Sequence, residues 1–484
     1  MSVLSKNVAS LLASQVATWF VSAAFLVIVP SRFGADDFGE FQLVLAFIGF
    51  FTLAGSLGTN IYLLKEVARD YSTAGRLVVD AIEMKLVMGV VLAVCAVGLG
   101  KALGYTNEVL VLIAIASVGM IATIVNEVFV AGLAGMERMA GTALWGTLQV
   151  YLGNGIGILV ALTSRSLPAF AVGFAVATVI PLIGNFYAIR PLLHGRAGKF
   201  GTNWKKIARG GIPLFILSAV NLLYGTIDIP ILESISGRES VGYYGLAYRW
   251  VGMPIFVTTV VASAFMPRMS ALAHEAPGEF ANLVNRAIKI VMVVTVPAAV
   301  GLIAVSTDLL NLVYGDEYDR AAVLMQILGL HLPIAALDTI LAIALIASDR
   351  QNRYLIIAVA AAVVNPVLNI IAIRVTEHRY GNGAIGAAIV TGATELFIMC
   401  CAMRLRSRSV MDRRTVIYIG KCVAAVLAMA GALWMVRSTH LFVKIPVGAV
   451  VYGGASLVLG TVSVARVAGV MKEIGRGRQR TTNP

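Results

Sequence analysis

The stretch from Tyr354 to Ile373, YLIIAVAAAVVNPVLNIIAI, runs for twenty residues without an Asp, Glu, Lys or Arg. That is the length a helix needs to cross the hydrocarbon core of a bilayer. Similar uncharged runs recur along the chain, and the clearest are 7–31, 41–64, 139–164, 166–189 and 445–465. The sequence therefore predicts a protein that crosses a membrane many times.

The composition supports this prediction. Of the 484 residues, 59% are hydrophobic and only 13% are charged, which leaves too little polar surface for a soluble globule. Continuous apolar runs are typical of membrane helices rather than of the alternating strands of a barrel. We expect an all-α polytopic membrane protein with about 14 transmembrane helices, at 7–30, 40–63, 79–100, 109–133, 141–162, 167–189, 210–233, 242–266, 286–306, 321–346, 354–373, 383–403, 415–436 and 445–465.

Most of the 38 Lys and Arg residues fall on one side of these predicted spans, and they are densest in 190–209, 404–414 and 472–480. The positive-inside rule then places both termini in the cytoplasm, with the chain in the cytoplasmic (inner) membrane. The basic groups either only set this topology and touch anionic lipid, or they recognise a head group or a partner. The net charge of +13 gives no separate support for nucleic-acid binding.

Two octets about two hundred residues apart share one pattern. Residues 34–41 read GADDFGEF and residues 237–244 read GRESVGYY, so both follow Gly-x-acid-x-apolar-Gly-x-aromatic. Each joins an outgoing predicted helix to an ingoing one, which favours an internal duplication of parallel topology. We expect an N-lobe at 1–190, a cytoplasmic basic linker at 191–209, a C-lobe at 210–405, a C-terminal helix pair at 406–468 and a cytoplasmic tail at 469–484, with six helices in each lobe.

No constellation of residues predicts an enzyme. The four cysteines show no metal-ligand or CxxC spacing, the five histidines are scattered, and no GxxxxGK[ST] loop is present. The predicted loops leave no room for a catalytic domain. We expect a protein that is not an enzyme and that has no metal centre or cofactor beyond a coupling Na⁺ or H⁺.

Charged residues inside predicted spans are candidates for a functional site, because an ionisable group in hydrocarbon is costly unless it is paired or faces water. Asp228 and Arg249 share a depth, which suggests an ion pair. Lys85 and Glu127 also lie at similar depths, and Lys289 could approach Asp338. Each pair is either a structural bridge between helices or part of a site.

Glu395 lies near the middle of its predicted span, after Thr391 and Thr394, while the preceding span carries Asn365 beside Pro366, and Asn369. Carboxylate, amide and hydroxyl oxygens next to a helix that proline disrupts are suited to Na⁺ or to a proton relay. Alternatively, the two asparagines only join helices through hydrogen bonds.

Three stretches resemble one known family. The hairpin FGADDFGEF at 33–41, the segment VGYYGLAYRW at 241–250, and the pair NPVLN at 365–369 with GAIGAAIVT at 383–391 are similar to the polysaccharide flippases of the multidrug/oligosaccharidyl-lipid/polysaccharide (MOP) exporter superfamily. Fourteen helices also resemble the flippase branch, since the drug exporters usually have twelve.

The resemblance implies movement of an oligosaccharide linked to undecaprenyl diphosphate from the inner to the outer leaflet, for surface polysaccharide biosynthesis, by alternating access driven by an ion gradient. It implies as partners this lipid-linked oligosaccharide, membrane lipids, and the polysaccharide polymerase and chain-length machinery. Arg249 would meet the diphosphate, and the related lipid II flippases place a sodium site near Asp228, Asn365, Asn369 and Thr391. This chain has Asn369 where those proteins carry an acid, and it lacks their arginines within helices 1 and 2.

The candidate substrate-binding residues are Arg249, Arg32, Lys65, Lys85 and Glu127, and the candidate ion-coupling residues are Asp228, Asn365, Asn369, Thr391 and Glu395.

Three other functions compete. A drug/cation antiporter would want an acidic, aromatic cavity. A membrane polymerase or ligase would need a large outer loop, and the predicted outer loops are short. A non-transporting scaffold of polysaccharide assembly is compatible with the same sequence.

Overall fold

A computed structural model describes residues 18, 20–69, 71–136, 138, 140–193, 200–407 and 409–462. Within these ranges the chain is almost entirely helical and contains no strand. Among the described residues, eleven helical segments are long and apolar enough to cross a membrane. The prediction of an all-α polytopic membrane protein is confirmed. The start of the first predicted span lies outside the described residues.

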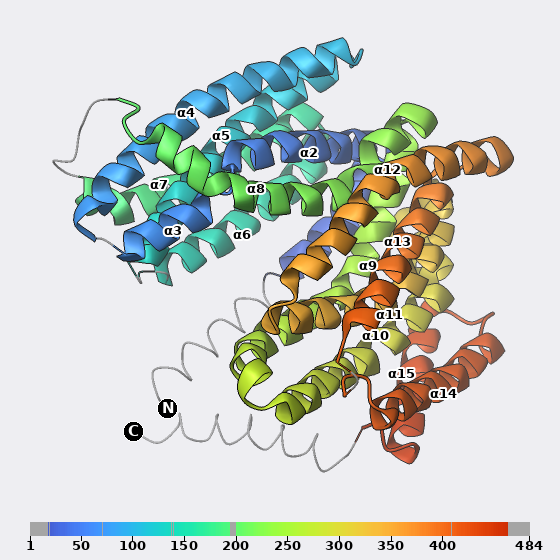
Figure 1. Cartoon of the computed structure of the whole chain (residues 1–484). Coiled ribbons are helices and arrows are strands. Elements are labelled where there is room, and N and C mark those ends of the chain that lie inside the picture. The colour runs from blue at the N-terminus through green and yellow to red at the C-terminus, as the bar shows by residue number, and fades with distance from the viewer. Residues whose placement is uncertain are drawn as a thin grey trace, which may run out of the picture. The chain divides into compact units, whose positions relative to one another are not determined.

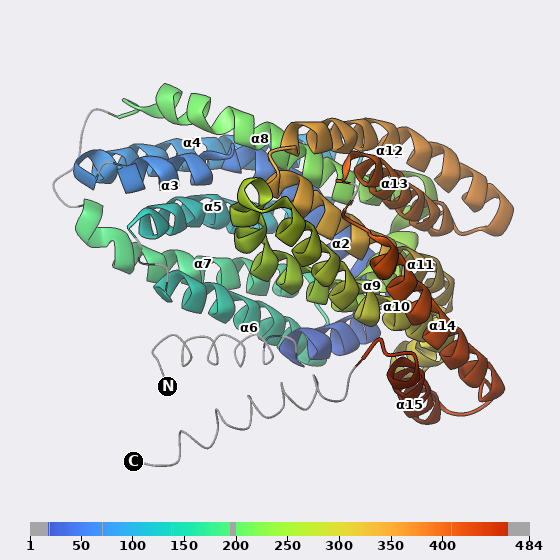
Figure 2. The same ribbon diagram turned by 60° about the horizontal axis from the view of Figure 1, so that its bottom comes forward.

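The chain divides into two compact units, the first ending at Gly242 and the second starting at Tyr243 (Figures 1 and 2). The first contains a helix at Phe20–Phe33 and then α2 (Ala35–Ser56), α3 (Thr59–Arg69), α4 (Tyr71–Ala102), α5 (Asn107–Gly135), α6 (Ala140–Thr163), α7 (Leu167–Leu193), α8 (Trp204–Thr226) and the start of α9 (Asp228–Glu275). Here α5 is central, because α2, α3, α4 and α7 all pack against it. Figures 1 and 2 both show α4, α5 and α7 running alongside one another.

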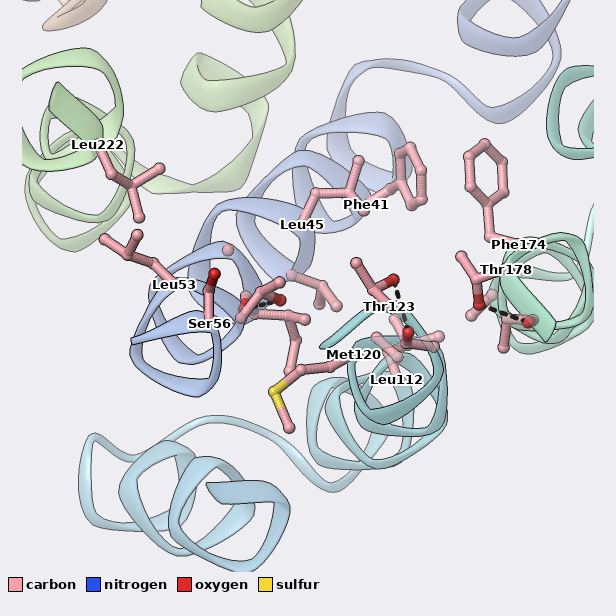
Figure 3. Close-up of a pocket in the computed structure, with 18 of the residues that line it drawn as sticks. Phe41, Leu45, Leu53, Ser56, Leu112, Met120, Thr123, Phe174, Thr178 and Leu222 are labelled. Carbon is pink, nitrogen blue, oxygen red and sulfur yellow. Dashed lines mark hydrogen bonds between the residues drawn. The ribbon is translucent and has the colours of Figure 1, made fainter. Parts of the chain in front are cut away.

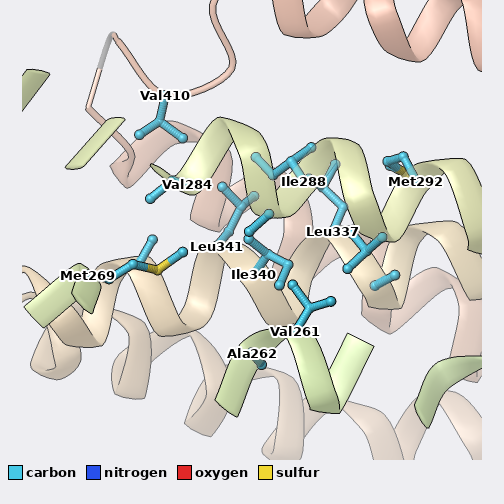
Figure 4. Close-up of a cluster of buried hydrophobic side chains, with 14 of the residues drawn as sticks. Val261, Ala262, Met269, Val284, Ile288, Met292, Leu337, Ile340, Leu341 and Val410 are labelled. Atoms are coloured by element: carbon cyan, nitrogen blue, oxygen red, sulfur yellow. The ribbon is translucent and has the colours of Figure 1, made fainter. Parts of the chain in front are cut away.

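The second unit contains the rest of α9, then α10 (Pro277–Tyr314), η1 (Gly315–Tyr318), α11 (Asp319–Ala347), α12 (Gln351–Tyr380), α13 (Ala384–Leu405), α14 (Arg413–Met435) and α15 (Leu441–Val458). Here α11 packs against both α10 and α13. A buried cluster that includes Val261, Ile288, Ile340 and Leu341 joins α9, α10 and α11 (Figure 4).

The boundary between the units follows from the packing of α8. This helix, which belongs to the seventh predicted span, packs against α2 and α3 of the first unit. The sequence pattern predicted a different division, at the basic linker 191–209. That division comes from the repeat and not from packing, and it stays a prediction.

Two predicted spans are each broken into two helices. The second span ends as α2 at Ser56 and resumes as α3 at Thr59, because Leu57 (φ 46°) and Gly58 (φ 61°) both adopt the left-handed conformation. The seventh span ends as α8 at Thr226 and resumes as α9 at Asp228. Such breaks are tolerated at membrane depth when other groups satisfy the freed backbone.

The repeated octets share an unusual backbone conformation. Gly34 lies at φ 86°, ψ 171° and Gly237 at φ 79°, ψ 176°, in a region that is essentially restricted to glycine. The first residue of the motif therefore sets the same sharp bend in both copies. This agreement is structural support for the predicted duplication, independent of the sequence pattern.

The second glycine of each octet contacts the other octet. A side-chain carbon added to Gly39 would lie 1.9 Å from the carbonyl oxygen of Arg238, and one added to Gly242 would lie 2.0 Å from that of Ala35. Ala35 and Arg238 occupy the same position in their octets, so the contact is reciprocal. Only glycine allows the two helices to approach this closely.

Candidate functional site

The break between α2 and α3 is closed by a buried lysine from α4. Lys85 has 0% exposure, and its Nζ donates to the carbonyl oxygens of Gly55 (2.6 Å) and Ser56 (2.5 Å). The Thr59 hydroxyl donates to the same Ser56 oxygen at 2.9 Å. Carbonyls that a helix leaves without partners would be costly in an apolar interior, so Lys85 satisfies the break.

Glu127 on α5 is linked to this lysine through Ser56, whose hydroxyl donates to Glu127 Oε2 at 2.7 Å. The predicted association of Lys85 with Glu127 is thus present as a chain that runs through the helix break. The two charged residues differ in position, because Lys85 is enclosed whereas Glu127 lines a cavity.

The cavity has a volume of about 770 Å³ and lies within the first unit. Its wall is mostly apolar, and Figure 3 shows Phe41, Leu53, Met120 and Phe174 around it. The hydroxyls of Thr123 and Thr178 in this wall are bonded to carbonyls of their own helices, at 2.8 and 2.7 Å. Among the residues that line it in the described ranges, Glu127 is the only ionisable one. This cavity suits an apolar or cationic ligand, or a proton on Glu127, rather than a diphosphate.

A second polar group lies where α12 and α13 of the second unit meet. Asn369 donates to Asn365 Oδ1 at 2.8 Å, and Asn365 donates to the Thr394 hydroxyl at 3.2 Å. The hydroxyls of Tyr244 and Thr391 lie 3.0 Å apart. Asn369 has 0% exposure, yet its Oδ1 has no hydrogen-bond partner. A buried carbonyl oxygen of this kind is a hard ligand that a cation could use.

Asp338 on α11 belongs to a separate polar group near the start of α12. It has 6% exposure and accepts a hydrogen bond from the Tyr354 hydroxyl at 3.1 Å, while its Oδ1 is buried without a hydrogen-bond partner. Glu395 is close enough for the two carboxyl groups to repel each other electrostatically. Sequence reasoning placed Lys289 near Asp338, and this is wrong: Lys289 Nζ lies over the ring of Tyr418, 5.9 Å from its centre. The two belong to different faces of their helices.

The remaining candidates are spread over both units. Arg249 is half-buried in α9, where the neighbouring Trp250 donates to the Tyr314 hydroxyl at 3.1 Å. Arg32 is exposed at the end of the first described helix. Asp228 is buried at the first position of α9. Because Asp228 and Arg249 lie in different units, their pairing stays a prediction. The Lys65 side chain lies outside the described set.

Sequence reasoning missed an ion pair beside the glycine contact. Arg238 Nη1 lies 2.5 Å from Glu40 Oε2, and Nη2 donates to the Thr106 hydroxyl at 3.4 Å. Glu40 is buried. The signal was available, because both charged residues lie inside the repeated octets, but the octets were interpreted as hairpins of an internal duplication and not as partners of each other.

Comparison with known proteins identifies the family. A family model described as polysaccharide biosynthesis protein matches residues 4–273, which is more than half of the chain. The chain belongs to the polysaccharide biosynthesis protein family. A second model, MatE, matches residues 213–371. The two matches confirm the predicted membership of the MOP exporter superfamily.

Two similar proteins come from Haloferax volcanii. The "Probable low-salt glycan biosynthesis flippase Agl15" is 22% identical over 429 residues, covering 87% of this chain and 88% of the relative. The "Probable flippase AglR" is 23% identical over 496 residues, covering 98% and 99%. The chain is thus a multi-pass membrane protein of the flippase and transporter type.

Solved structures share the fold. The lipid II flippase MurJ in an inward closed conformation has a TM-score of 0.76 at 16% identity, covering 92% of this chain and 98% of MurJ. An inward-facing multidrug resistance MATE transporter has a TM-score of 0.62 at 16% identity, covering 85% and 95%. These similarities confirm the fold.

Proposed function

We propose that this chain moves an oligosaccharide carried on undecaprenyl diphosphate across the cytoplasmic membrane, for the synthesis of a surface polysaccharide. The observation that carries the proposal is the family match over 4–273, together with a relative named as a glycan biosynthesis flippase over 87% of the chain. In this proposal both termini are cytoplasmic, the protein is not an enzyme, and it works beside a polysaccharide polymerase and chain-length machinery.

Arg249 is the proposed ligand of the diphosphate. It is a half-buried guanidinium within a membrane helix, where an unneeded charge would be selected against. A guanidinium binds phosphate oxygens through two parallel hydrogen bonds, which an ammonium cannot do. Glu127 would instead face the uncharged part of the substrate, because the wall around it offers hydroxyls and apolar groups.

The driving force is proposed to be a Na⁺ or H⁺ gradient acting on the two polar groups of the second unit. Asn365, Asn369 and Thr391 supply oxygen atoms, and Asp338 and Glu395 supply carboxyl groups. Two buried oxygens, Asn369 Oδ1 in one group and Asp338 Oδ1 in the other, lack hydrogen bonds, which is expected of groups whose ligand supplies the missing contact.

The test is to deplete the protein in its host and to measure which leaflet holds the undecaprenyl-diphosphate oligosaccharide. Completed units should accumulate on the cytoplasmic leaflet, and the wild-type chain should restore delivery. Arg249→Ala should fail to restore it at normal membrane abundance, whereas Arg268→Ala, on the exposed end of the same helix, should succeed. Delivery that continues without the protein, in a host with no second flippase, would overturn the proposal.

A drug/cation antiporter is the second candidate, because the first unit holds an apolar, partly aromatic cavity with one carboxyl group. Efflux of a lipophilic cation from vesicles would distinguish the two functions. Efflux that Glu127→Gln abolishes and Arg249→Ala leaves intact would favour the antiporter.

A further inference from the structure

A small cavity of about 240 Å³ lies in the second unit, apart from the groups described above. It is formed where α9 gives way to α10, where α11 ends, and where the chain leaves α13. Its floor is apolar, because Phe280, Leu341, Leu345 and Val410 belong to the buried core of this unit. Figure 4 shows Leu341 and Val410 within that core.

Two arginines line this cavity. Arg350 Nη1 donates to the Leu405 carbonyl at 2.6 Å, and Arg406 Nη1 donates to the Met403 carbonyl at 3.0 Å. Both guanidinium groups are therefore anchored on the last turn of α13. These bonds use one nitrogen of each group, and the buried Nε of Arg406 has no hydrogen-bond partner.

The charge at this cavity is unbalanced. Within the described ranges, neither Arg350 nor Arg406 forms an ion pair with a carboxylate. Asp349 and Glu279 are nearby in the sequence, but neither lines the cavity. Ser407 adds a hydroxyl group, whereas the Ser348 hydroxyl already donates to the carbonyls of Ala344 and Leu345. The start of α10 beside them has no side-chain cap. Two like charges held together without an acid favour an anionic ligand.

We infer that Arg350 and Arg406 bind the phosphate of an anionic glycerophospholipid. The arginines and the Ser407 hydroxyl match the phosphate oxygens, and the apolar floor accepts methylene groups of an acyl chain. A volume of about 240 Å³ is below the roughly 300–1,000 Å³ typical of pockets for drug-sized ligands, so the cavity would take only the phosphate end of a lipid. The cavity lies at the edge of the 404–414 basic group, on the side expected to be cytoplasmic.

The basic group at 404–414 either only sets the topology or recognises a lipid head group, and the two roles need different residues. A topology determinant needs only net positive charge, and its effect is the same at any nearby position. A lipid site needs the two arginines that line the cavity. Arg353 and Arg404 provide matched controls, because each lies within three residues of a cavity arginine, is exposed, and is absent from the cavity wall.

The test is a titration of the purified full-length chain with phosphatidylglycerol, with phosphatidylcholine as the neutral lipid, followed by native mass spectrometry. The double variant Arg350→Gln/Arg406→Gln should bind phosphatidylglycerol on the order of tenfold more weakly, since charged hydrogen bonds are lost. Arg353→Gln/Arg404→Gln removes the same charge and should bind like the wild type. Equal losses in both double variants would overturn the inference.

A second pair of variants guards against misfolding, since Gln cannot reproduce the contacts of arginine with α13. Ser407→Glu leaves both arginines in place but puts a negative charge at the exposed rim, and it should weaken phosphatidylglycerol binding. Ser409→Glu, which is also exposed and lies outside the cavity wall, should not. Unchanged binding in Ser407→Glu would contradict the inference.

Binding of farnesyl diphosphate, a short isoprenyl diphosphate, tests whether the cavity takes a phospholipid or the lipid carrier of the proposed substrate. We expect its binding to be insensitive to Arg350→Gln/Arg406→Gln. If that double variant lost farnesyl diphosphate and kept phosphatidylglycerol, the cavity would belong to the carrier and the inference would fail. The proposed flippase function would not be affected by that failure.

Discussion

Lys85 in the first unit and Asn369 in the second are equally buried, with 0% exposure each, but they differ in what surrounds their polar atoms. The Lys85 ammonium is held by two carbonyls that a broken helix had left without partners. Asn369 uses its nitrogen within α12 and keeps a buried oxygen without a hydrogen bond. A complete set of hydrogen bonds indicates a structural role, whereas an incomplete one indicates a place for a ligand.

The largest expected effect is at Lys85. Lys85→Met should lower the free energy of unfolding by about 3 kcal/mol, because it removes the lysine from the buried Gly55 carbonyl and leaves the Ser56 carbonyl with the Thr59 hydroxyl alone. Thermal unfolding of the purified protein in detergent would measure the change. Lys101→Met, at the exposed end of the same helix, is the control. If both variants melted alike, Lys85 would not support the break.

A smaller effect on stability is expected at Glu127, which is linked to Lys85 through Ser56. Glu127→Gln keeps an oxygen that can accept from Ser56 but removes the charge, so a loss of about 1 kcal/mol is expected. If the hydrogen bond carries the effect, Ser56→Ala, which removes the bond, should melt at a lower temperature than Glu127→Gln, which keeps it. A loss as large as that of Lys85→Met would mean that the charge, not the hydrogen bond, joins the two residues.

Asp412 provides a reference effect of known size, because it caps a helix outside the predicted membrane spans. Its carboxylate caps α14 by accepting from the Thr415 amide at 2.8 Å, and the hydrogen bonds with Thr415 hold the pKa of Asp412 below its usual 3.8. Asp412→Ala should cost about 1 kcal/mol at neutral pH.

Because the pKa of Asp412 is lower in the folded chain, its contribution is present above pH 3.8 and is lost as the pH falls further. The difference in melting temperature between the wild type and Asp412→Ala should therefore shrink below that pH. A difference that stayed constant would show that the cap does not depend on charge.

The smallest effect on stability is expected at Asp338. Asp338→Asn keeps an acceptor for Tyr354 and removes a buried charge, so the melting temperature should change little. Transport, in contrast, should lose its dependence on the Na⁺ or H⁺ gradient, and Glu395→Gln should behave in the same way. Intact coupling in both variants, measured in vesicles with imposed gradients, would assign this group a structural role.

The sequence was sufficient for the spans but not for the breaks within them. Uncharged runs of about twenty residues report burial in lipid directly, and each predicted span coincides with helices in the described ranges. The break at Leu57 and Gly58 has only a short local signal, and its support comes from Lys85 on another helix.

For the candidate site, the sequence was informative where partners are close in the chain. Asn365 and Asn369 are four residues apart, so one turn of helix brings them together as predicted. The partner of Lys85 is a backbone carbonyl, which no side-chain pattern reveals. Asp338 was assigned to Lys289 by depth alone, whereas the rotation of each helix about its axis directs it to Tyr354.

The reciprocal contact at Gly39 and Gly242 limits how either glycine can change during evolution. Each glycine is required by the backbone of the other octet, so neither octet can change there alone. A larger residue in one octet would clash with the main chain of the other octet. No side-chain substitution there could make room for it. The two positions should therefore drift more slowly than the rest of the octets in which they lie.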